Sequence, residues 1–177
     1  MISSFDIADA MLETVAGEAR AAFPEECCGI MTGVVRAGRA RVTRVIAVAN
    51  VAPAGQRRRF FELDPAALLH VQRDLRAVRR GGGRETIIGY YHSHPGGIAR
   101  PSAADLAGTL ETGRVWLIAA PQGRTGCVAM GACLRLGHGA SRRFRPLTLN
   151  AIREPGLLRG AGIRFLKGRG RMPPAPG

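Results

Sequence analysis

The stretch Ile87-Ile-Gly-Tyr-Tyr-His-Ser-His-Pro95, separated by six residues from Ser102-Ala-Ala-Asp105, is the part of the sequence that most clearly indicates the fold. Its apolar and aromatic beginning is typical of a buried β-strand. Pro95 has no backbone N–H for a sheet ladder, so we expect the strand to stop there. Alternate residues of a strand project from one face, so the imidazoles of His92 and His94 are expected to point the same way.

Ser102 is expected to begin a helix, and Asp105 lies three residues later on the same helix face. Two imidazoles and one carboxylate form a three-ligand set that leaves a fourth zinc position open for water. Each part also has a structural interpretation. A His-x-His pair on a strand is usually incidental, and Ser-x-x-Asp is a capping box that satisfies free amides at a helix start. Their occurrence together favours a metal site.

A further motif lies upstream, in Pro24-Glu-Glu-Cys-Cys-Gly29. Together with the two histidines and the Ser-x-x-Asp pair, it resembles the signature of the JAMM/MPN+ metallopeptidase family over residues 6–136. The resemblance implies an α/β (α+β) fold with a mixed, curved β-sheet flanked by helices, similar in layout to the cytidine deaminases. It also implies a zinc ion held by His92, His94 and Asp105.

The family pattern places the catalytic acid/base at Glu26, which would take a proton from zinc-activated water and pass it to the leaving amine. Glu25 is a competing candidate from the sequence alone, and the Pro-x-Glu-x-Cys-Gly register favours Glu26. The resemblance assigns Ser102 to stabilising the oxyanion of the tetrahedral intermediate, and the same hydroxyl also suits a helix N-cap. Ser93 is expected to face away from the metal.

The implied function is a zinc-dependent metallopeptidase that hydrolyses an amide or isopeptide bond at the C-terminal tail of a ubiquitin-like protein. The stretch from Asp105 to Trp116 is too short for the insertion usual in eukaryotic deubiquitinases. The chain instead resembles short bacterial hydrolases that release a residue, often cysteine, from a sulfur-carrier protein with a Gly-Gly tail. Such a tail is expected to pair with a strand at 58–63, where Arg57-Arg58-Arg59 suits either an acidic carrier or a solvated edge.

The alternative interpretation is a non-catalytic MPN scaffold that serves protein–protein interaction. Such scaffolds typically lose one or more metal positions, whereas this sequence keeps all of them. We therefore favour the enzyme.

The net charge of +13 is almost entirely due to arginine, since Lys167 is the only lysine. Basic residues are frequent from Arg142 to Arg171, which indicates a solvated tail. Aromatic content is 5%, and no stacking-aromatic motif or helix-turn-helix is present, so no nucleic-acid partner is expected. No apolar run approaches the roughly 20 residues that span a bilayer, and the N-terminus lacks a signal-peptide layout, so we expect no membrane contact and a cytoplasmic location.

The chain is expected to form one JAMM/MPN domain over 1–150, followed by a basic, poorly ordered Gly/Pro-rich tail over 151–177. Asp6 and the pair Asp64-Pro65 are expected to cap helices. Hydrophobic spacing predicts helices over 6–22, 65–80 and 102–113, and strands over 28–35, 41–49, 58–63, 86–94, 115–120, 126–136 and 144–149. The four cysteines form no Cys-x-x-Cys pair, so buried thiols are expected, and Cys28 is not expected to act as a nucleophile.

Overall fold

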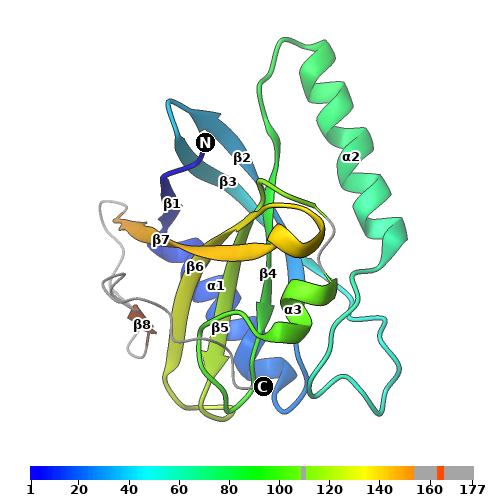
Figure 1. Ribbon diagram of the computed structural model, residues 1–177, viewed down its shortest axis with the longest axis vertical. Helices are drawn as coiled ribbons and strands as arrows, with labels where there is room; N and C mark the ends of the chain where they lie inside the picture. The colour runs from blue at the N-terminus through cyan, green and yellow to red at the C-terminus, as the bar shows by residue number, and fades with distance from the viewer. Residues whose placement is uncertain (109–110, 154–162, 166–177) are drawn as a thin grey trace.

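A computed structural model describes residues 1–108, 111–153 and 163–165 (Figure 1). The helices are α1 (Asp9–Ala22), α2 (Pro65–Arg80) and α3 (Ala103–Gly108), with a short 3-10 turn, η1 (Gly139–Ser141). The strands are β1 (Ser4–Ala8), β2 (Cys28–Arg36), β3 (Arg39–Val48), β4 (Thr86–Ser93), β5 (Val115–Pro121), β6 (Val128–Leu136), β7 (Arg143–Ile152) and β8 (Ile163–Phe165). This arrangement confirms the expected mixed α+β fold.

The strands form one sheet in the order β5-β4-β2-β3-β1-β7-β6-β8. Strand β5 also pairs with β6, so the sheet curves round until it closes on itself. Strand β1 runs parallel to both of its neighbours, β3 and β7, whereas β2 is antiparallel to β3 and β4. The sheet is therefore mixed and curved, as the family resemblance implied.

Helix α1 packs inside the curve of the sheet and contacts β1 and β3 to β7 (Figure 1). Its apolar stripe consists of Leu12, Val15, Ala16 and Ala19, all of which are fully buried. The spacing of these residues is that of one helix face, so burying them against the sheet forms the larger of two core clusters.

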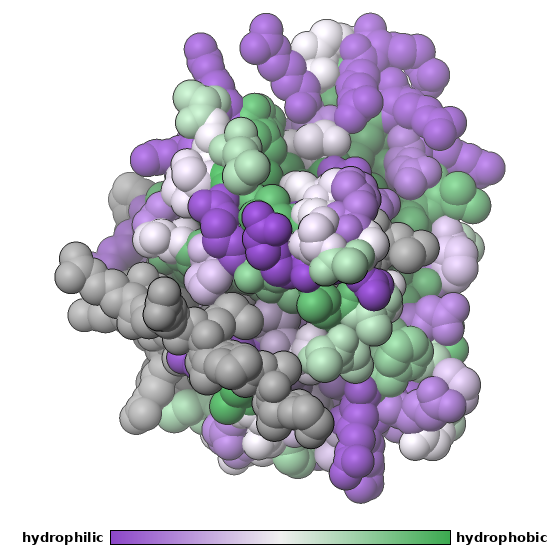
Figure 2. All heavy atoms as spheres, viewed as in Figure 1, coloured by the Kyte–Doolittle hydropathy of each residue, from purple (hydrophilic) through white to green (hydrophobic). Residues whose placement is uncertain are grey.

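Helix α2 covers the opposite face of the sheet, where Val71 and Leu75 pack in a second core cluster with residues of β2, β4 and β5. The predicted start of α2 is confirmed, because Asp64 Oδ1 accepts a hydrogen bond of 2.9 Å from the Ala66 N–H and Pro65 is the first helical residue. Hydrophilic side chains cover the end of the molecule that carries α2 (Figure 2). Within the described residues, no helix combines the length and apolarity needed to cross a membrane.

Strand β4 carries a register shift against β2, because Met31 pairs with Gly89 while Thr32 pairs with Ile87. The extra residue, Ile88, changes the alternation of side chains along the strand. As a result Tyr91 faces α1, whereas His92 faces the opposite side, towards α3.

The expectation that Asp6 caps the first helix was wrong. Asp6 lies in β1, where its carboxylate pairs with Arg39 at 3.3 Å and accepts a hydrogen bond from Asn150 at 2.8 Å. The side chain therefore joins β1 to β3 and β7, and α1 begins only at Asp9.

The expected strand over 58–63 is also absent. A substrate tail therefore has no strand in this segment with which to form the expected β-pairing. Only an isolated bridge between Asn50 and Leu63 is present, because the N–H of Glu62 is bonded to the Asn50 side chain and not to a neighbouring strand.

The helix after Ser102 is shorter than expected. It ends at Gly108, and residues 111–113 are not helical. A tail was expected over 151–177. Its first two residues belong to β7, and residues 163–165 form β8, which pairs with β6. The remainder of the tail, apart from Arg153, lies outside the described residues, so the domain boundary at 150 stays a prediction.

Candidate metal centre

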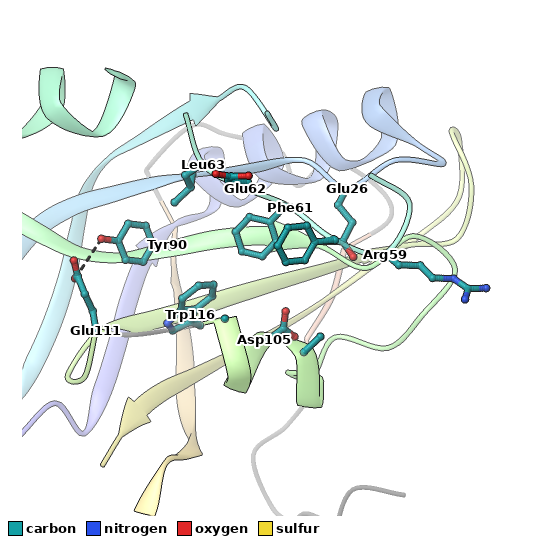
Figure 3. Close-up of a pocket in the computed structure, with 12 residues that line it drawn as sticks. Glu26, Arg59, Phe61, Glu62, Leu63, Tyr90, Asp105, Glu111 and Trp116 are labelled. Carbon is teal, nitrogen blue, oxygen red and sulfur yellow. Dashed lines mark hydrogen bonds between the residues drawn. The ribbon is translucent and has the colours of Figure 1, made fainter. Parts of the chain in front are cut away.

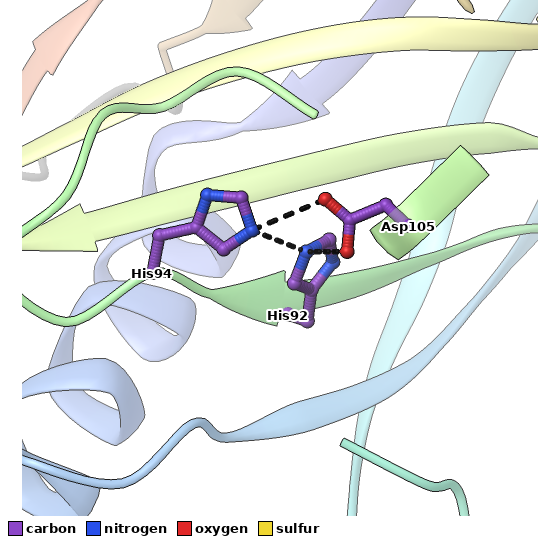
Figure 4. Close-up of side chains that lie close together, drawn as sticks. All are labelled: His92, His94 and Asp105. Atoms are coloured by element: carbon purple, nitrogen blue, oxygen red, sulfur yellow. Dashed lines mark hydrogen bonds and ion pairs between the residues drawn. The ribbon is translucent and has the colours of Figure 1, made fainter. Parts of the chain in front are cut away.

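Three side chains from β4, the segment after it and α3 converge on one point (Figure 4). His92 Nε2 lies 2.9 Å from His94 Nε2 and 3.1 Å from Asp105 Oδ1. His94 Nε2 lies 3.3 Å from Asp105 Oδ2. One ligand atom from each of these residues lies within 4.8 Å of the other two. The structure therefore brings together the three metal ligands expected from the sequence.

The chemistry of this donor set fits a zinc ion. His94 Nδ1 lies 3.1 Å from the carbonyl oxygen of Ile98, so a proton on Nδ1 is donated to that oxygen and the lone pair of Nε2 is left for a metal. The ring of His92 is fully buried and stacks on Phe61, with a centroid distance of 4.5 Å. Two imidazoles and one carboxylate could hold the ion and leave one coordination position open.

Ser102 and Asp105 form a reciprocal capping box at the start of α3. The Ser102 N–H donates to Asp105 Oδ2 at 2.6 Å, and the Asp105 N–H donates to Ser102 Oγ at 3.1 Å. The structural interpretation of this pair is thus confirmed, and it is compatible with a metal site because the same carboxylate also faces the histidines. The Ser102 hydroxyl accepts one hydrogen bond and keeps its own hydrogen for donation.

The three candidate ligands also shift one another's pKa. Burial would raise the pKa of Asp105, but hydrogen bonds from His92 and His94 hold it well below its usual range. Burial lowers the pKa of His92. Burial acts in the same direction on His94, but the hydrogen bond and negative charge of Asp105 outweigh it and raise the pKa. Zinc binds an ionised carboxylate and neutral imidazoles, so its binding would displace the proton that Asp105 favours on His94.

Glu26 lies beside this centre and lines the same pocket as Asp105 (Figure 3). The residue is 7% exposed, and burial raises the pKa of the carboxyl to about 7. The charge of His94 lowers this pKa and that of Asp105 raises it. The backbone holds the residue in place, since the Glu26 N–H donates to the Arg57 carbonyl at 2.7 Å. Glu25 does not line the pocket, so the geometry agrees with the choice of Glu26.

The sequence profile of the prokaryotic homologs of the JAB domain matches residues 8–132 of the chain. The chain belongs to this family. The match includes Glu26, both histidines and Asp105, and it confirms the resemblance to JAMM/MPN proteins.

Curated and solved relatives support the same assignment. This JAB-family chain is 37% identical over 101 residues to the desampylase of Haloferax volcanii, an alignment that covers 57% of this chain and 66% of the archaeal protein, just under two thirds of its length. A protein of Desulfitobacterium hafniense solved in solution is 26% identical, with a TM-score of 0.65 over 86% of this chain and 97% of its own. A Salinibacter ruber protein is 27% identical, with a TM-score of 0.57 over 90% and 99%.

Neither of the two cysteines that follow Glu26 in this JAB domain has the features of a nucleophile. All four cysteines are free thiols. Burial raises the pKa of Cys27 to about 11 and that of Cys28 to about 12, so neither is a thiolate near neutral pH. Ser93 is buried, and its Oγ accepts a hydrogen bond of 2.9 Å from the Cys27 N–H. Its hydroxyl thus holds the backbone next to Glu26 and does not face the candidate ligands.

Two residues near the centre were not predicted from the sequence. Phe61 stacks on His92 although it lies in a segment that was expected to be a strand. Asn50 donates to the carbonyl oxygens of Glu26 at 3.0 Å and Phe60 at 3.2 Å, and its Oδ1 accepts from the N–H groups of Ala52 and Glu62, both at 3.1 Å. No local pattern identifies Asn50, because its partners are up to 24 residues away.

Proposed function

We propose that this JAB-family chain is a zinc-dependent metallopeptidase that hydrolyses an amide or isopeptide bond at the C-terminal tail of a small ubiquitin-like or sulfur-carrier protein. The observation that carries the proposal is the convergence of His92, His94 and Asp105 beside a buried glutamate, Glu26. The relationship to an archaeal desampylase supports a conjugate of a ubiquitin-like modifier as the substrate. A cytoplasmic location stays a prediction.

His92, His94 and Asp105 would hold the zinc ion, each through one ligand atom. When bound, zinc supplies a Lewis acid that lowers the pKa of a water towards neutrality. Glu26 would accept the proton from the attacking water and return it to the departing amine. Burial opposes the charge of this carboxyl and raises its pKa in the zinc-free chain, which brings it nearer to the range in which a carboxyl both accepts and donates a proton.

Ser102 would donate its hydroxyl hydrogen to the oxyanion that develops on the cleaved carbonyl. The hydroxyl oxygen is already fixed by the N–H of Asp105, at 3.1 Å, so its position relative to the ligands is set by α3. Arg59 is exposed and lines the pocket beside the site, and Arg58 next to it is also exposed; both would favour an acidic carrier surface.

The test is cleavage of a ubiquitin-like carrier joined through its C-terminal glycine to an amine, followed by mass spectrometry. Zinc-loaded protein is expected to cleave the bond, a chelator to abolish cleavage, and added zinc to restore it. Glu26→Gln should lower kcat by roughly 10²- to 10⁴-fold without changing the zinc content. Glu25→Gln is the matched control and should keep its activity.

Full activity of Glu26→Gln would refute the mechanism. A chain that purifies fully folded, binds no zinc and cleaves no conjugate would instead support the alternative, a non-catalytic MPN scaffold.

A further inference from the structure

A second pocket, of about 290 Å³, lies between α2 and the first residues of β4. Of the seven described residues that line it, three are arginines, Arg76, Arg79 and Arg114, and none is acidic. We call it the arginine pocket. It shares no described lining residue with the pocket beside the metal centre, so it is a separate cavity.

Two of the three guanidinium groups are anchored on β4. Arg79 Nη2 donates a hydrogen bond of 3.1 Å to Thr86 Oγ1, and Arg114 Nη1 donates to the carbonyl oxygen of Ile87. Thr86 and Ile87 are consecutive residues at the start of β4, so the two cations are held close to each other. Because each guanidinium has five N–H donors, both keep donors for a ligand.

Arg76 brings a third positive charge to the arginine pocket. It lies three residues before Arg79, so both side chains leave α2 on the same face. Arg76 forms no ion pair with any described residue, and Asp74, the only acidic residue of α2, does not line the pocket. Among the described residues, the one carboxylate paired with these arginines is Glu111, at 2.6 Å from Arg114. Three cations and one carboxylate leave an excess of positive charge that an anion would neutralise.

The chemistry of the arginine pocket fits a phosphate group. Phosphate oxygens accept charge-assisted hydrogen bonds from several guanidinium groups at once, and the planar fork of arginine matches two of the oxygens. Gln72 and Thr86 add neutral polar groups to the lining, and the apolar side chains of Leu75 and Ile87 are buried there. A volume of about 290 Å³ is at the lower end of small-molecule sites, which suits free phosphate or a small phosphate monoester.

We propose that the arginine pocket binds a phosphate dianion, either free phosphate or the monoester of a small molecule, through Arg76, Arg79 and Arg114. The balance of charge favours a dianion over a monoanion: Arg114 is already paired with Glu111, so two positive charges remain. The site lies outside the metal centre and does not depend on the proposed hydrolysis.

Arg114 connects the arginine pocket to the pocket beside the metal centre. Its Nε donates to Glu111 Oε2, and the same oxygen accepts a hydrogen bond of 3.3 Å from the Tyr90 hydroxyl (Figure 3). Glu111 and Tyr90 both line the pocket beside the metal centre, where the ring of Tyr90 lies 5.6 Å from that of Trp116. A dianion at Arg114 competes with Glu111 for the same guanidinium. Its binding therefore weakens this ion pair and changes the surroundings of Tyr90.

Isothermal titration calorimetry of the whole chain with inorganic phosphate, glycerol 3-phosphate and acetate tests the proposal. An ionic strength of about 0.15 M screens the longer-range attraction between a basic chain and any anion. Both phosphates are expected to bind saturably, and acetate at least about tenfold more weakly. Tighter binding of glycerol 3-phosphate than of inorganic phosphate would identify a monoester as the ligand, and the reverse order would identify free phosphate.

Arg76→Gln and Arg79→Gln should each weaken the binding of phosphate at least about tenfold, because each removes charged hydrogen-bond donors. Both side chains are exposed, so the variants are expected to fold. Arg73→Gln is the matched control, because Arg73 is exposed on the same helix and does not line the pocket. It should bind phosphate as tightly as the parent.

Two measurements test the connection to the pocket beside the metal centre. Glu111→Gln should strengthen the binding of phosphate several-fold, because it releases Arg114. Glu62→Gln, which removes a carboxyl group from the same lining but forms no ion pair with Arg114, should not. The fluorescence of Trp116, the only tryptophan, should change saturably with the midpoint found by calorimetry.

No saturable binding of either phosphate, or equal losses of binding in Arg73→Gln and Arg76→Gln, would overturn the proposal. Binding that leaves the fluorescence unchanged, or that Glu111→Gln does not strengthen, would overturn the connection through Arg114. None of these titrations requires turnover, so a failure of the proposed hydrolysis would leave their outcome unaffected.

Discussion

Asn50 links the proposed base to the segment that contains Phe60 and Phe61. Its side-chain amide makes four hydrogen bonds, two donated to the carbonyl oxygens of Glu26 and Phe60 and two accepted from the N–H groups of Ala52 and Glu62. One side chain thus fixes both the backbone of Glu26 and the segment that brings Phe61 onto His92. We infer that Asn50 is a positioning residue and that it does not touch the substrate.

Asn50→Ala is expected to reduce kcat while the protein still binds about one zinc per chain. The loss of hydrogen bonds should also reduce the free energy of unfolding by about 1–3 kcal/mol, measured by urea denaturation. Asn150→Ala is the matched control, because Asn150 donates to Asp6 between β1 and β7. It should lower stability and leave kcat unchanged. Equal losses of activity in the two variants would contradict a positioning role.

The pKa of Glu26 is predicted to be about 7 in the zinc-free protein, because burial opposes its charge. The ordinary value is 4.5, so the folded chain holds this proton to a higher pH than the unfolded chain does. The zinc-free protein should therefore lose stability as the pH rises from about 4.5 to about 7. Zinc favours the carboxylate and should lower the pKa.

This pKa can be measured by ¹³C NMR. The carboxyl resonance of Glu26 is assigned as the one that is absent from the Glu26→Gln variant, and it is titrated first with a chelator present and then with zinc. A midpoint near 4.5 without zinc would contradict the burial of the carboxyl seen in the structure.

The ligand residues were predictable from the sequence because their geometry is local. Strand spacing sets His92 relative to His94, and the capping box sets Asp105 relative to Ser102. The hydrogen bonds of Asn50 were not predictable, because they join parts of the chain that only the folded sheet brings together.

At the level of secondary structure, the elements that followed their own sequence pattern were predicted well. The start of α2 is fixed by its Asp-Pro cap, and β2, β4 and β5 by continuous apolar runs. Strand β1 was missed because its strand conformation comes from parallel pairing with β3 and β7, which are distant in sequence. The segment 58–63 was predicted as a strand because its residues favour one, whereas its backbone is held by Asn50.

The contact between β4 and β5 requires glycine at position 89. A Cβ atom there would lie 1.9 Å from the carbonyl oxygen of Val115, whereas a Cβ at Gly17 in α1 would meet nothing within 4 Å. Gly89→Ala should therefore reduce the free energy of unfolding by about 1–3 kcal/mol through strain. Gly17→Ala should raise it by up to about 1 kcal/mol through helix propensity.

Urea denaturation of both glycine variants tests this difference in sign. Because β4 carries His92, the Gly89→Ala variant is also expected to bind zinc more weakly. A Gly89→Ala protein as stable as the parent would show that the two strands are not packed as closely as described.

In the whole molecule, the order of the strands in the sheet brings the motifs together. Glu26 precedes β2, and the two histidines lie in and just after the end of β4. Asp105 lies in α3. The convergence of Glu26 with the histidines therefore depends on β2 and β4 being neighbours. The sequence indicated a shared site through its resemblance to a family, and the mixed curved sheet followed from the same resemblance. The pairing of β5 with β6, which closes the sheet, is local, because these consecutive antiparallel strands are joined across residues 122–127; the parallel pairing of β1 with β7 has no counterpart in any local pattern.

The most direct test is anomalous diffraction at the zinc edge from crystals of the chain grown with zinc. We predict one peak bonded to His92 Nε2, His94 Nε2 and a carboxylate oxygen of Asp105, at distances of about 2.0–2.2 Å. The carboxyl of Glu26 should lie within hydrogen-bond reach of the remaining coordination position. A zinc-soaked crystal with no peak among these three side chains, or with Glu26 turned away from it, would contradict the metallopeptidase.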